Sequence, residues 1–319
     1  MSEILKLTMK QFKFSLEKYR GTSSRHICPN CGKKEFVRYV NNETEEYLEE
    51  YVGKCNRIEK CGYHYTPKQY FDDKGEKVQF FTRKNVHVEK KSTYYYNEKL
   101  VLDSQHSDTK KSNLYHFLIQ FFNEEKVRNT FQKYLVGVSS LWEDAVVFWQ
   151  IDREFKVRAG KTMQYDLNTG KRDKAKFYWI KKDDSDKEMR QVFFGLHLLE
   201  LFKKYKIGIV ESEKTALMCD LFFDEKIIWL ASGGLMGINE RKLQDLSERE
   251  IILFPDLSAN NSKINAYDEW KSKAEFYGNK LNIEIKINQF LMHFSSTSDR
   301  ENQADLADFI LKNLRKNNI

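Results

Sequence analysis

The stretch IGIVESEKTA, residues 207–216, places a carboxylate directly after an apolar run and so constrains the fold of the last third of the chain. The run is short and rich in β-branched residues, which predicts a buried strand of a parallel sheet. Glu211 follows that strand, and Ser212 is a good N-cap for a helix beyond it. Ligands of open α/β sheets bind outside the carboxyl ends of the strands, so Glu211 is a candidate site residue.

The same pattern recurs twice downstream. Ile227 to Ala231 is a second apolar run and ends in Ser-Gly-Gly, a turn that lets backbone approach a ligand closely. Ile251 to Phe254 is a third run, and Asp256 follows it. Alternating strands and helices at this spacing predict a right-handed, doubly wound parallel sheet. The remaining predicted elements are helices over 239–247 and 265–277 and a fourth strand over 283–287.

The order of these features resembles a Toprim domain, the fold shared by bacterial primases, topoisomerases and some nucleases. The resemblance rests on Glu211 after one strand, Ser-Gly-Gly after the next, Asp256 after the third, and Asp305 with Asp308 in ADLADFIL. It implies that Glu211 is a general acid or base and that Asp256 holds Mg²⁺ or Mn²⁺ near a phosphate, with Asp305 and Asp308 as further candidate ligands. Lys214 is a candidate phosphate contact.

One position departs from that pattern. Toprim enzymes carry a second aspartate two residues after the first, where this chain has Ser258. A hydroxyl does not supply the charge of a carboxylate, and Mg²⁺ usually binds one or two carboxylates together with water. Two interpretations stay open: a catalytic site that uses Asp305 or Asp308 instead, or a scaffold with a degenerate site. Lone strand-end acids are also common as caps, and Glu213 and Lys214 suit a helix surface.

Four of the five cysteines lie between residues 28 and 61. Cys28 and Cys31 form the knuckle CPNCGK, and Cys55 and Cys61 form a wider second pair. Two pairs at this separation are typical of a zinc ribbon, in which four thiolates hold Zn²⁺ tetrahedrally. Disulfides are the alternative, but the start MSEILKLTMKQ lacks the apolar stretch of a secretion signal.

The histidines near the cluster leave the fourth ligand open. His26 and His64 flank it, and His64, three residues after Cys61, is the reserve ligand for a Cys₃His site. We expect the four cysteines. The fifth, Cys219, falls among apolar residues of a predicted helix and is expected to be a buried small hydrophobic residue.

Between the cysteine pairs, residues 36–40 and 47–52 are predicted to form a hairpin. Its face can carry Arg38, Lys54 and Arg57 with aromatic neighbours, a mixture suited to stacking bases and meeting phosphates. An alternative is that the aromatic residues only cover a small core.

Nearly the whole chain resembles a family of uncharacterised zinc-ribbon and Toprim-like proteins of bacterial mobile genetic elements. The run YVGKCNRIEKCGYHYTPKQYF and the knuckle carry this resemblance, and YLVGVSSLWEDAVVFWQID and QVFFGLHLLEL agree with it. The resemblance implies primase-like work on DNA in replication or transfer of such an element.

Residues 145–180 alternate like antiparallel strands, with Asn-Thr-Gly at 168–170 as a hairpin turn. Ten basic and three acidic residues lie between Arg153 and Lys182. This asymmetry predicts a groove for a nucleic-acid strand, although a solvated hairpin surface is the alternative. The cations assigned to the groove are Arg158, Lys161, Lys171, Arg172, Lys174 and Lys176, with Phe177, Tyr178 and Trp179 near enough to stack on bases.

Together these features predict an α+β multidomain protein: a zinc β-ribbon over residues 1–84, a linker over 85–113, a basic α+β middle domain over 114–202 and a Toprim-like α/β domain over 203–319. No apolar run approaches the ~20 residues of a membrane span, so a cytoplasmic protein is expected. The net charge is +7. The expected partner is DNA, single-stranded or primer–template, with a replicative helicase as a candidate protein partner. A metal-dependent nuclease is the second enzymatic alternative.

Overall fold

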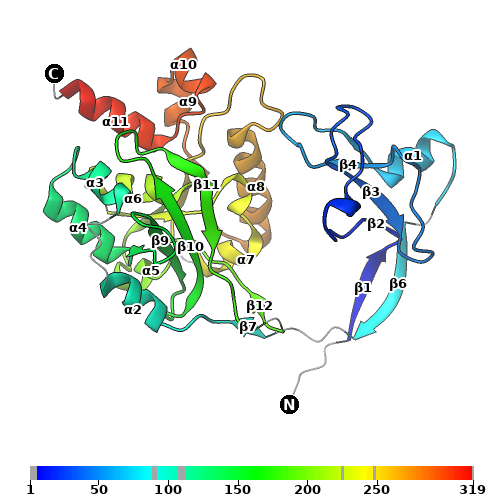
Figure 1. Cartoon of the computed structure of the whole chain (residues 1–319), viewed down its shortest axis with the longest axis horizontal. Helices are drawn as coiled ribbons and strands as arrows, with labels where there is room; N and C mark the ends of the chain where they lie inside the picture. The colour runs from blue at the N-terminus through cyan, green and yellow to red at the C-terminus, as the bar shows by residue number, and fades with distance from the viewer. Residues whose placement is uncertain are drawn as a thin grey trace. The chain divides into compact units, whose positions relative to one another are not determined.

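The computed structural model describes residues 6–78, 80–87, 92–106, 112–184, 186–223, 226–246 and 249–317. The chain divides into two compact units (Figure 1). The N-terminal unit comprises Met1–Lys90 with Asn261–Lys263, and the C-terminal unit comprises Lys91–Asn260 with Ile264–Ile319. The fold is a mixed α+β arrangement with an N-terminal zinc-ribbon region, as the sequence predicts.

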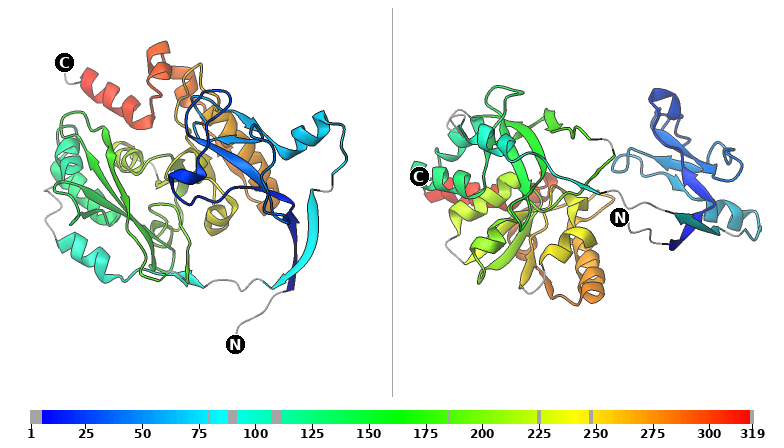
Figure 2. Two further views of the ribbon diagram at one scale, coloured as in Figure 1. Left: turned by 45° about the vertical axis from the view of Figure 1, so that its right-hand side comes forward. Right: turned by 90° about the horizontal axis from the view of Figure 1, so that it is seen from below.

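The N-terminal unit is built on short antiparallel strands. Four of them form one sheet in the order β2-β3-β4-β5, and β1 pairs with β6 in a separate two-stranded ribbon (Figure 2). Helix α1 (Pro67–Asp73) follows the sheet and begins at a capping box made by Thr66 and Gln69. The strands are β1 (Lys6–Phe12), β2 (Phe14–Leu16), β3 (Phe36–Asn41), β4 (Gly53–Cys55), β5 (His64–Tyr65) and β6 (Phe81–His87).

The predicted strand over 36–40 is confirmed as β3, but the predicted partner over 47–52 is wrong. Only Tyr47 of that stretch makes a bridge to β3, at Val40. A turn closed by the Val52 amide on the Glu49 carbonyl then bends the chain, so the paired strand begins at Gly53.

An antiparallel sheet in the order β11-β10-β9-β8 forms one part of the C-terminal unit. The two inner strands are almost wholly buried, whereas β11 is largely exposed. The predicted turn at 168–170 joins β10 to β11, and the Asp166 carboxylate accepts hydrogen bonds from Asn168 and Thr169 within it. The strands are β8 (Gly137–Val138), β9 (Val146–Ile151), β10 (Val157–Tyr165) and β11 (Arg172–Trp179).

A four-stranded parallel sheet in the order β14-β13-β15-β16 forms the other part. Its strands are β13 (Lys206–Val210), β14 (Ile227–Ala231), β15 (Ile251–Leu253) and β16 (Ile285–Ile287), which confirms the predicted runs. The short β7 (Thr93–Tyr94) and β12 (Glu188–Met189) also pair in parallel.

Helices cover both sheets, and in Figure 1 α2, α3 and α4 lie on the far side of the antiparallel sheet from α7 and α8. Ser212 caps α6 by accepting from the Thr215 amide, as the sequence predicts. The predicted helix over 239–247 is α7 followed by a 3-10 turn over Gln244–Leu246. The helices of this unit are α2 (Lys99–His106), α3 (Asn113–Leu118), α4 (Glu124–Lys133), α5 (Leu198–Leu201), α6 (Glu213–Phe222), α7 (Glu240–Leu243), α8 (Ala266–Leu281), α9 (Phe290–Phe294), α10 (Thr297–Glu301) and α11 (Leu306–Asn317).

One hydrophobic core runs through the segments that the sequence separates into a middle domain (114–202) and a Toprim-like domain (203–319). It joins Phe148 and Phe194 to residues of β13, β14 and α6. The structure therefore groups these two segments in one unit. The predicted linker over 85–113 is also grouped differently, because it contains α2 and buries Tyr94, Tyr96 and Val101 against β9.

Among the described residues, no helix combines the length and apolar character that crossing a bilayer requires.

His197 is a buried titratable group in the core of the C-terminal unit. Its exposed fraction is 1%, and its Nε2 lies 3.1 Å from the backbone oxygen of Lys133. Burial lowers the pKa of His197 to about 4. The unfolded chain therefore binds this proton at a higher pH than the folded chain does, and stability falls as the pH drops from about 6.5 toward 4.

We expect His197→Gln to remove this pH-dependent loss, which is on the order of 3 kcal/mol at its full extent. Urea unfolding between about pH 7.5 and pH 4.5 measures it. The stability advantage of the wild type over the variant should shrink toward acid, because only the wild type carries the buried imidazole. Exposed His116→Gln is the matched control. A wild-type advantage that stays constant with pH would contradict the assignment.

Candidate functional site

Four cysteine side chains meet in the N-terminal unit and form the cysteine cluster. Cys28 and Cys31 come from the turn before β3, Cys55 ends β4, and Cys61 lies in the next turn. All four Sγ atoms lie within 4.8 Å of one another, with separations of 3.7 Å for Cys28–Cys61 and 4.0 Å for Cys31–Cys55. Sulfurs at the corners of a tetrahedron ~2.3 Å from one Zn²⁺ are about 3.8 Å apart. The donor set fits a structural zinc ion.

Both knuckles are shaped for this arrangement. Gly32 and Gly62 adopt φ of 65° and 61°, which lets each loop fold back beneath its cysteines. Burial raises the pKa of Cys55 to about 12, whereas the Asn30 amide, a hydrogen-bond donor to Cys61 at 3.4 Å, lowers the pKa of Cys61 to about 6. Because Zn²⁺ binds the thiolate form, a bound ion would favour ionisation of the buried Cys55.

Neither nearby histidine belongs to the cluster. His64, the reserve ligand, is exposed and pairs through Nε2 with the Tyr39 hydroxyl at 2.9 Å, and His26 pairs with Glu17. Of the predicted cations on this face, Arg38 donates to the Leu48 carbonyl and covers the Tyr47 ring. The other two, Lys54 and Arg57, are half-buried.

The C-terminal unit contains a cavity of about 320 Å³, the acidic cavity, between its two sheets. One wall is the carboxyl edge of the parallel sheet, with Glu211 after β13, Gly233 and Gly234 after β14, and Asp256 after β15. Asp305, just before α11, completes this wall. The opposite wall is β10 and the start of β11, and it includes Lys161, Tyr165 and Arg172.

Two carboxyls of this wall, those of Glu211 and Asp256, have raised pKa values. Burial raises the pKa of Glu211 to about 7, with a further contribution from the negative charge of Asp305. Burial, followed by repulsion from Glu211 and Asp305, raises the pKa of Asp256 well above its usual range. Grouped carboxyls with raised pKa values are typical of sites that handle protons or cations.

Two other predicted cation ligands are arranged differently. Asp308 and Asp305 cap α11 reciprocally: the Asp308 amide donates to Asp305 at 2.8 Å, and the Asp305 amide donates to Asp308 at 3.1 Å. Asp308 lines a neighbouring cavity instead of the acidic cavity. Ser258 accepts from the Ala266 amide at 2.8 Å, so its hydroxyl serves the start of α8. Among the described residues, only the cysteines bring three or more ligand atoms within 4.8 Å of one another.

A buried ion pair spans the acidic cavity. Lys161 of β10 pairs with Glu213 of α6, and their exposed fractions are 3% and 2%. Lys242 of α7 is also buried, donates to the Ser232 carbonyl at 2.9 Å, and has a pKa lowered by burial to about 8. The sequence predicts Lys161 as a nucleic-acid contact and Glu213 as a helix surface residue; the structure buries both. The apolar pattern of β10 is the signal that points to this burial.

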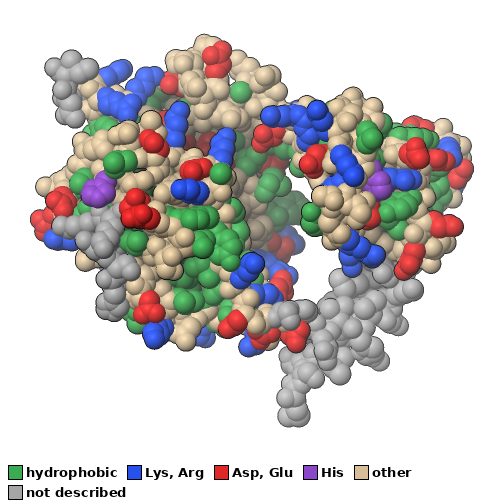
Figure 3. Space-filling view, in the orientation of Figure 1, with side chains coloured by type: hydrophobic (Ala, Val, Ile, Leu, Met, Phe, Trp, Pro, Cys, Tyr) green, Lys and Arg blue, Asp and Glu red, His purple; other side chains and the backbone are tan. Residues whose placement is uncertain are grey.

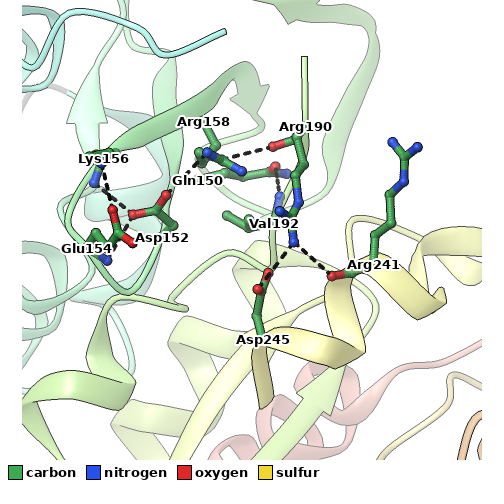
Figure 4. A network of polar contacts seen from close by, with 9 residues as sticks. All are labelled: Gln150, Asp152, Glu154, Lys156, Arg158, Arg190, Val192, Arg241 and Asp245. Carbon is green, nitrogen blue, oxygen red and sulfur yellow. Dashed lines mark hydrogen bonds and ion pairs between the residues drawn. The ribbon is translucent and has the colours of Figure 1, made fainter. Parts of the chain in front are cut away.

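Arg158, a second predicted nucleic-acid contact, lies in a buried polar network (Figure 4). Its guanidinium is 3.4 Å from Asp152 and donates to the Arg190 carbonyl, and Arg190 in turn reaches Asp245 at 3.4 Å. Lys171 and Arg172, by contrast, are exposed. Lys214 lines the acidic cavity and donates from Nζ to the Gly170 carbonyl at 3.2 Å.

Comparisons with known proteins place family models on two parts of the chain. The family described as a domain of unknown function (DUF6371) matches residues 112–257, and a putative zinc β-ribbon finger matches residues 12–76. No curated protein matches the sequence.

Two solved structures were matched at low sequence identity. The primase fragment of the bacteriophage T7 primase-helicase protein is 15% identical, covers 82% of this chain and 88% of its own, and has a TM-score of 0.34. The Aquifex aeolicus primase, with zinc-binding and RNA polymerase domains, is 13% identical, covers 95% and 84%, and has a TM-score of 0.37. Scores of this size do not establish a shared fold.

The cysteine geometry predicts one zinc ion per chain. Cys28→Ser should release it and unfold the N-terminal unit, because the ion replaces a large core there. His64→Ala should keep the full zinc content. Elemental analysis, and the amount of metal that a chelator removes, measure the zinc content of both variants. Zinc-free protein purified under reducing conditions, or zinc loss in His64→Ala, would contradict the four-cysteine assignment.

The Lys161–Glu213 pair predicts a large cost for losing one partner. Glu213→Gln leaves the Lys161 charge buried and should destabilise the C-terminal unit by about 3–5 kcal/mol in urea unfolding. Lys161→Met together with Glu213→Gln should recover part of this loss, because no uncompensated charge then remains on the pair. Lys286→Met, which breaks an exposed pair with Glu250, is the control and should cost less than about 1 kcal/mol. If Glu213→Gln and the control lose the same free energy of unfolding, the pair has no structural role.

Proposed function

We propose that this protein is a nucleic-acid-binding, primase-like protein whose acidic cavity is a Toprim-like site for metal-dependent nucleotidyl transfer. The observation that carries the proposal is one cavity that brings carboxyls and cations together. Glu211, Asp256 and Asp305 supply the acids, while Arg172 and Lys214 supply cations beside them.

The donor set suits a divalent metal ion. Buried carboxyls with pKa values raised by burial and mutual repulsion gain most from a neighbouring positive charge. Mg²⁺ keeps several waters and takes only one or two protein carboxylates, so a loosely spaced set is sufficient. Asp256 and Asp305 would hold the ion, and when bound it would neutralise charge on a phosphate oxygen.

The protein's own residues would divide the remaining tasks. Glu211 stands at the strand end, where it can take a proton from an attacking hydroxyl or return one to a leaving group. Gly233 and Gly234 leave open space over the backbone, so a phosphate can approach this turn closely. Arg172 and Lys214 face the same space and would pair with phosphate oxygens.

The substrate class that best suits the acidic cavity and the exposed face of β11 is a nucleic-acid strand. Strand β11 carries Phe177, with 40% of its surface exposed, beside Trp179, and aromatic faces stack on bases of any sequence. The zinc-ribbon region adds half-buried cations in the same chain. Single-stranded DNA or a primer–template, in the replication or transfer of a mobile element, is the proposed context, with a replicative helicase as the proposed partner.

A non-catalytic scaffold is the second candidate, and Ser258 favours it. Its hydroxyl is committed to the Ala266 amide, and the carboxylate expected at that position in Toprim enzymes is missing. The cavity therefore has one fewer negative charge with which to hold a divalent ion.

Substitution of Glu211 separates the two candidates. Glu211→Gln should reduce Mg²⁺- or Mn²⁺-dependent primer synthesis on a single-stranded template by about 10²-fold or more, because a general acid or base is lost, while strand binding stays intact. Asp256→Asn should have a similar effect through weaker metal binding. Exposed Glu275→Gln on α8 is the control and should behave like wild type.

Ser258→Asp should tighten Mg²⁺ binding, measured by calorimetry, because it restores a carboxylate. If the wild type makes no metal-dependent product on primed, unprimed or nicked templates and Ser258→Asp leaves Mg²⁺ affinity unchanged, the catalytic proposal fails and the scaffold stands.

A further inference from the structure

A second cavity of about 560 Å³ adjoins the acidic cavity and is lined by cations from two elements. Lys171 comes from the turn between β10 and β11, and Lys312, Arg315 and Lys316 come from the last turns of α11. We call this cavity the basic hollow. Figure 3 shows Lys and Arg side chains gathered over α11 and the adjoining end of the hairpin.

Asp299 and Asp308 also line the hollow, so its four cations outnumber its carboxylates by two. Among the described residues, only Lys312 of the four forms an ion pair, with Asp299 at 3.0 Å. Arg315 lies over the Phe121 ring, 5.5 Å from its centroid, which holds the guanidinium in place. Lys171, Arg315 and Lys316 are all exposed at the rim of the hollow.

A structural explanation accounts for only part of the charge. Basic residues in the last turn of a helix interact favourably with its dipole, which explains Arg315 and Lys316. Lys171 belongs to a different element and lines the same hollow. Like charges that line one hollow repel, so the arrangement is stabilised by an anion between them.

The basic hollow lies next to the acidic cavity, because residues that line the two are bonded to each other or adjacent in sequence. Lys214 lines the acidic cavity, and its Nζ donates to the Gly170 carbonyl in the turn that edges the hollow. Asp305 and Asp308, bonded to each other, lie one in each cavity. A chain of phosphates that leaves the acidic cavity past Lys214 therefore meets Lys171 next.

We infer that the basic hollow binds the phosphate backbone of a single nucleic-acid strand whose end lies in the acidic cavity. The inference rests on the proposed function and extends it, because it assigns the path of the strand to α11 and the hairpin turn. Lys171 and Lys316 make phosphate contacts, and the aromatic ring of Phe121 keeps Arg315 at the same depth. The contacts carry no sequence preference, since they involve charge alone.

The test measures binding of the full chain to a fluorescent oligothymidylate of about 16 nucleotides by anisotropy over a range of salt concentrations. Lys171→Ala combined with Lys316→Ala should weaken binding about tenfold at low salt. The salt dependence, as the slope of log affinity against log salt, should fall by about 1.4, or ~0.7 for each lost contact. Lys203→Ala combined with Lys204→Ala, two exposed lysines after α5, is the matched control and should change neither value.

The outcomes separate this inference from the proposed function. If the wild type binds with a steep salt dependence and the hollow variant matches the control, the inference is wrong while the proposed function stands. If the wild type binds no strand at any salt concentration, both fail. Both lysines are exposed, so the double variant Lys171→Ala and Lys316→Ala should unfold at the same temperature as the wild type. A loss of binding in this variant then reports lost contacts and not unfolding.

Discussion

The buried ion pair between Lys161 and Glu213 ties the antiparallel sheet to the parallel sheet, and the geometry of the acidic cavity depends on it. Lys161 comes from β10, Glu213 opens α6, and Lys242 on α7 adds a third buried charge that holds the Ser232 carbonyl. A buried charge without its partner costs several kcal/mol, so these three elements keep fixed relative positions. The pair thereby links the two walls of the cavity.

Because the two walls are linked in this way, carboxyls and Arg172 line opposite sides of the same cavity. The carboxyls of Glu211 and Asp256 stand at strand ends on one wall, and Arg172 lies on the other wall. The pKa values of Glu211 and Asp256 are raised because burial and repulsion between carboxylates outweigh the attraction of nearby cations. A ligand that brings a positive charge to one wall and negative charge to the other, as a metal-bound phosphate does, satisfies both.

The sequence predicts the parallel sheet well because its signals are local. Each strand is a short apolar run, each turn carries Gly, Ser or Asp, and β14 matches its predicted bounds of 227–231. The errors arise where distant residues decide. A turn closed by Glu49 and Val52 displaces one strand of the ribbon. The burial of Tyr94 and Tyr96 against β9 likewise depends on residues far away in the sequence. No local pattern reveals that Ser258 serves a helix start.

The cations between Arg153 and Lys182 illustrate the same limit for function. A count of charges treats them as one groove, but β10 is buried along nearly all its length, so a cation on it points into the protein whichever face it occupies. Arg158 and Lys161 consequently meet Asp152 and Glu213 instead of solvent. The hairpin's exposed charge lies along β11 and at the turn, and the turn lies beside α11 from the far end of the chain. A surface assembled from such distant segments leaves no signature in any single window of sequence, and only the packing of α11 beside the turn brings it together.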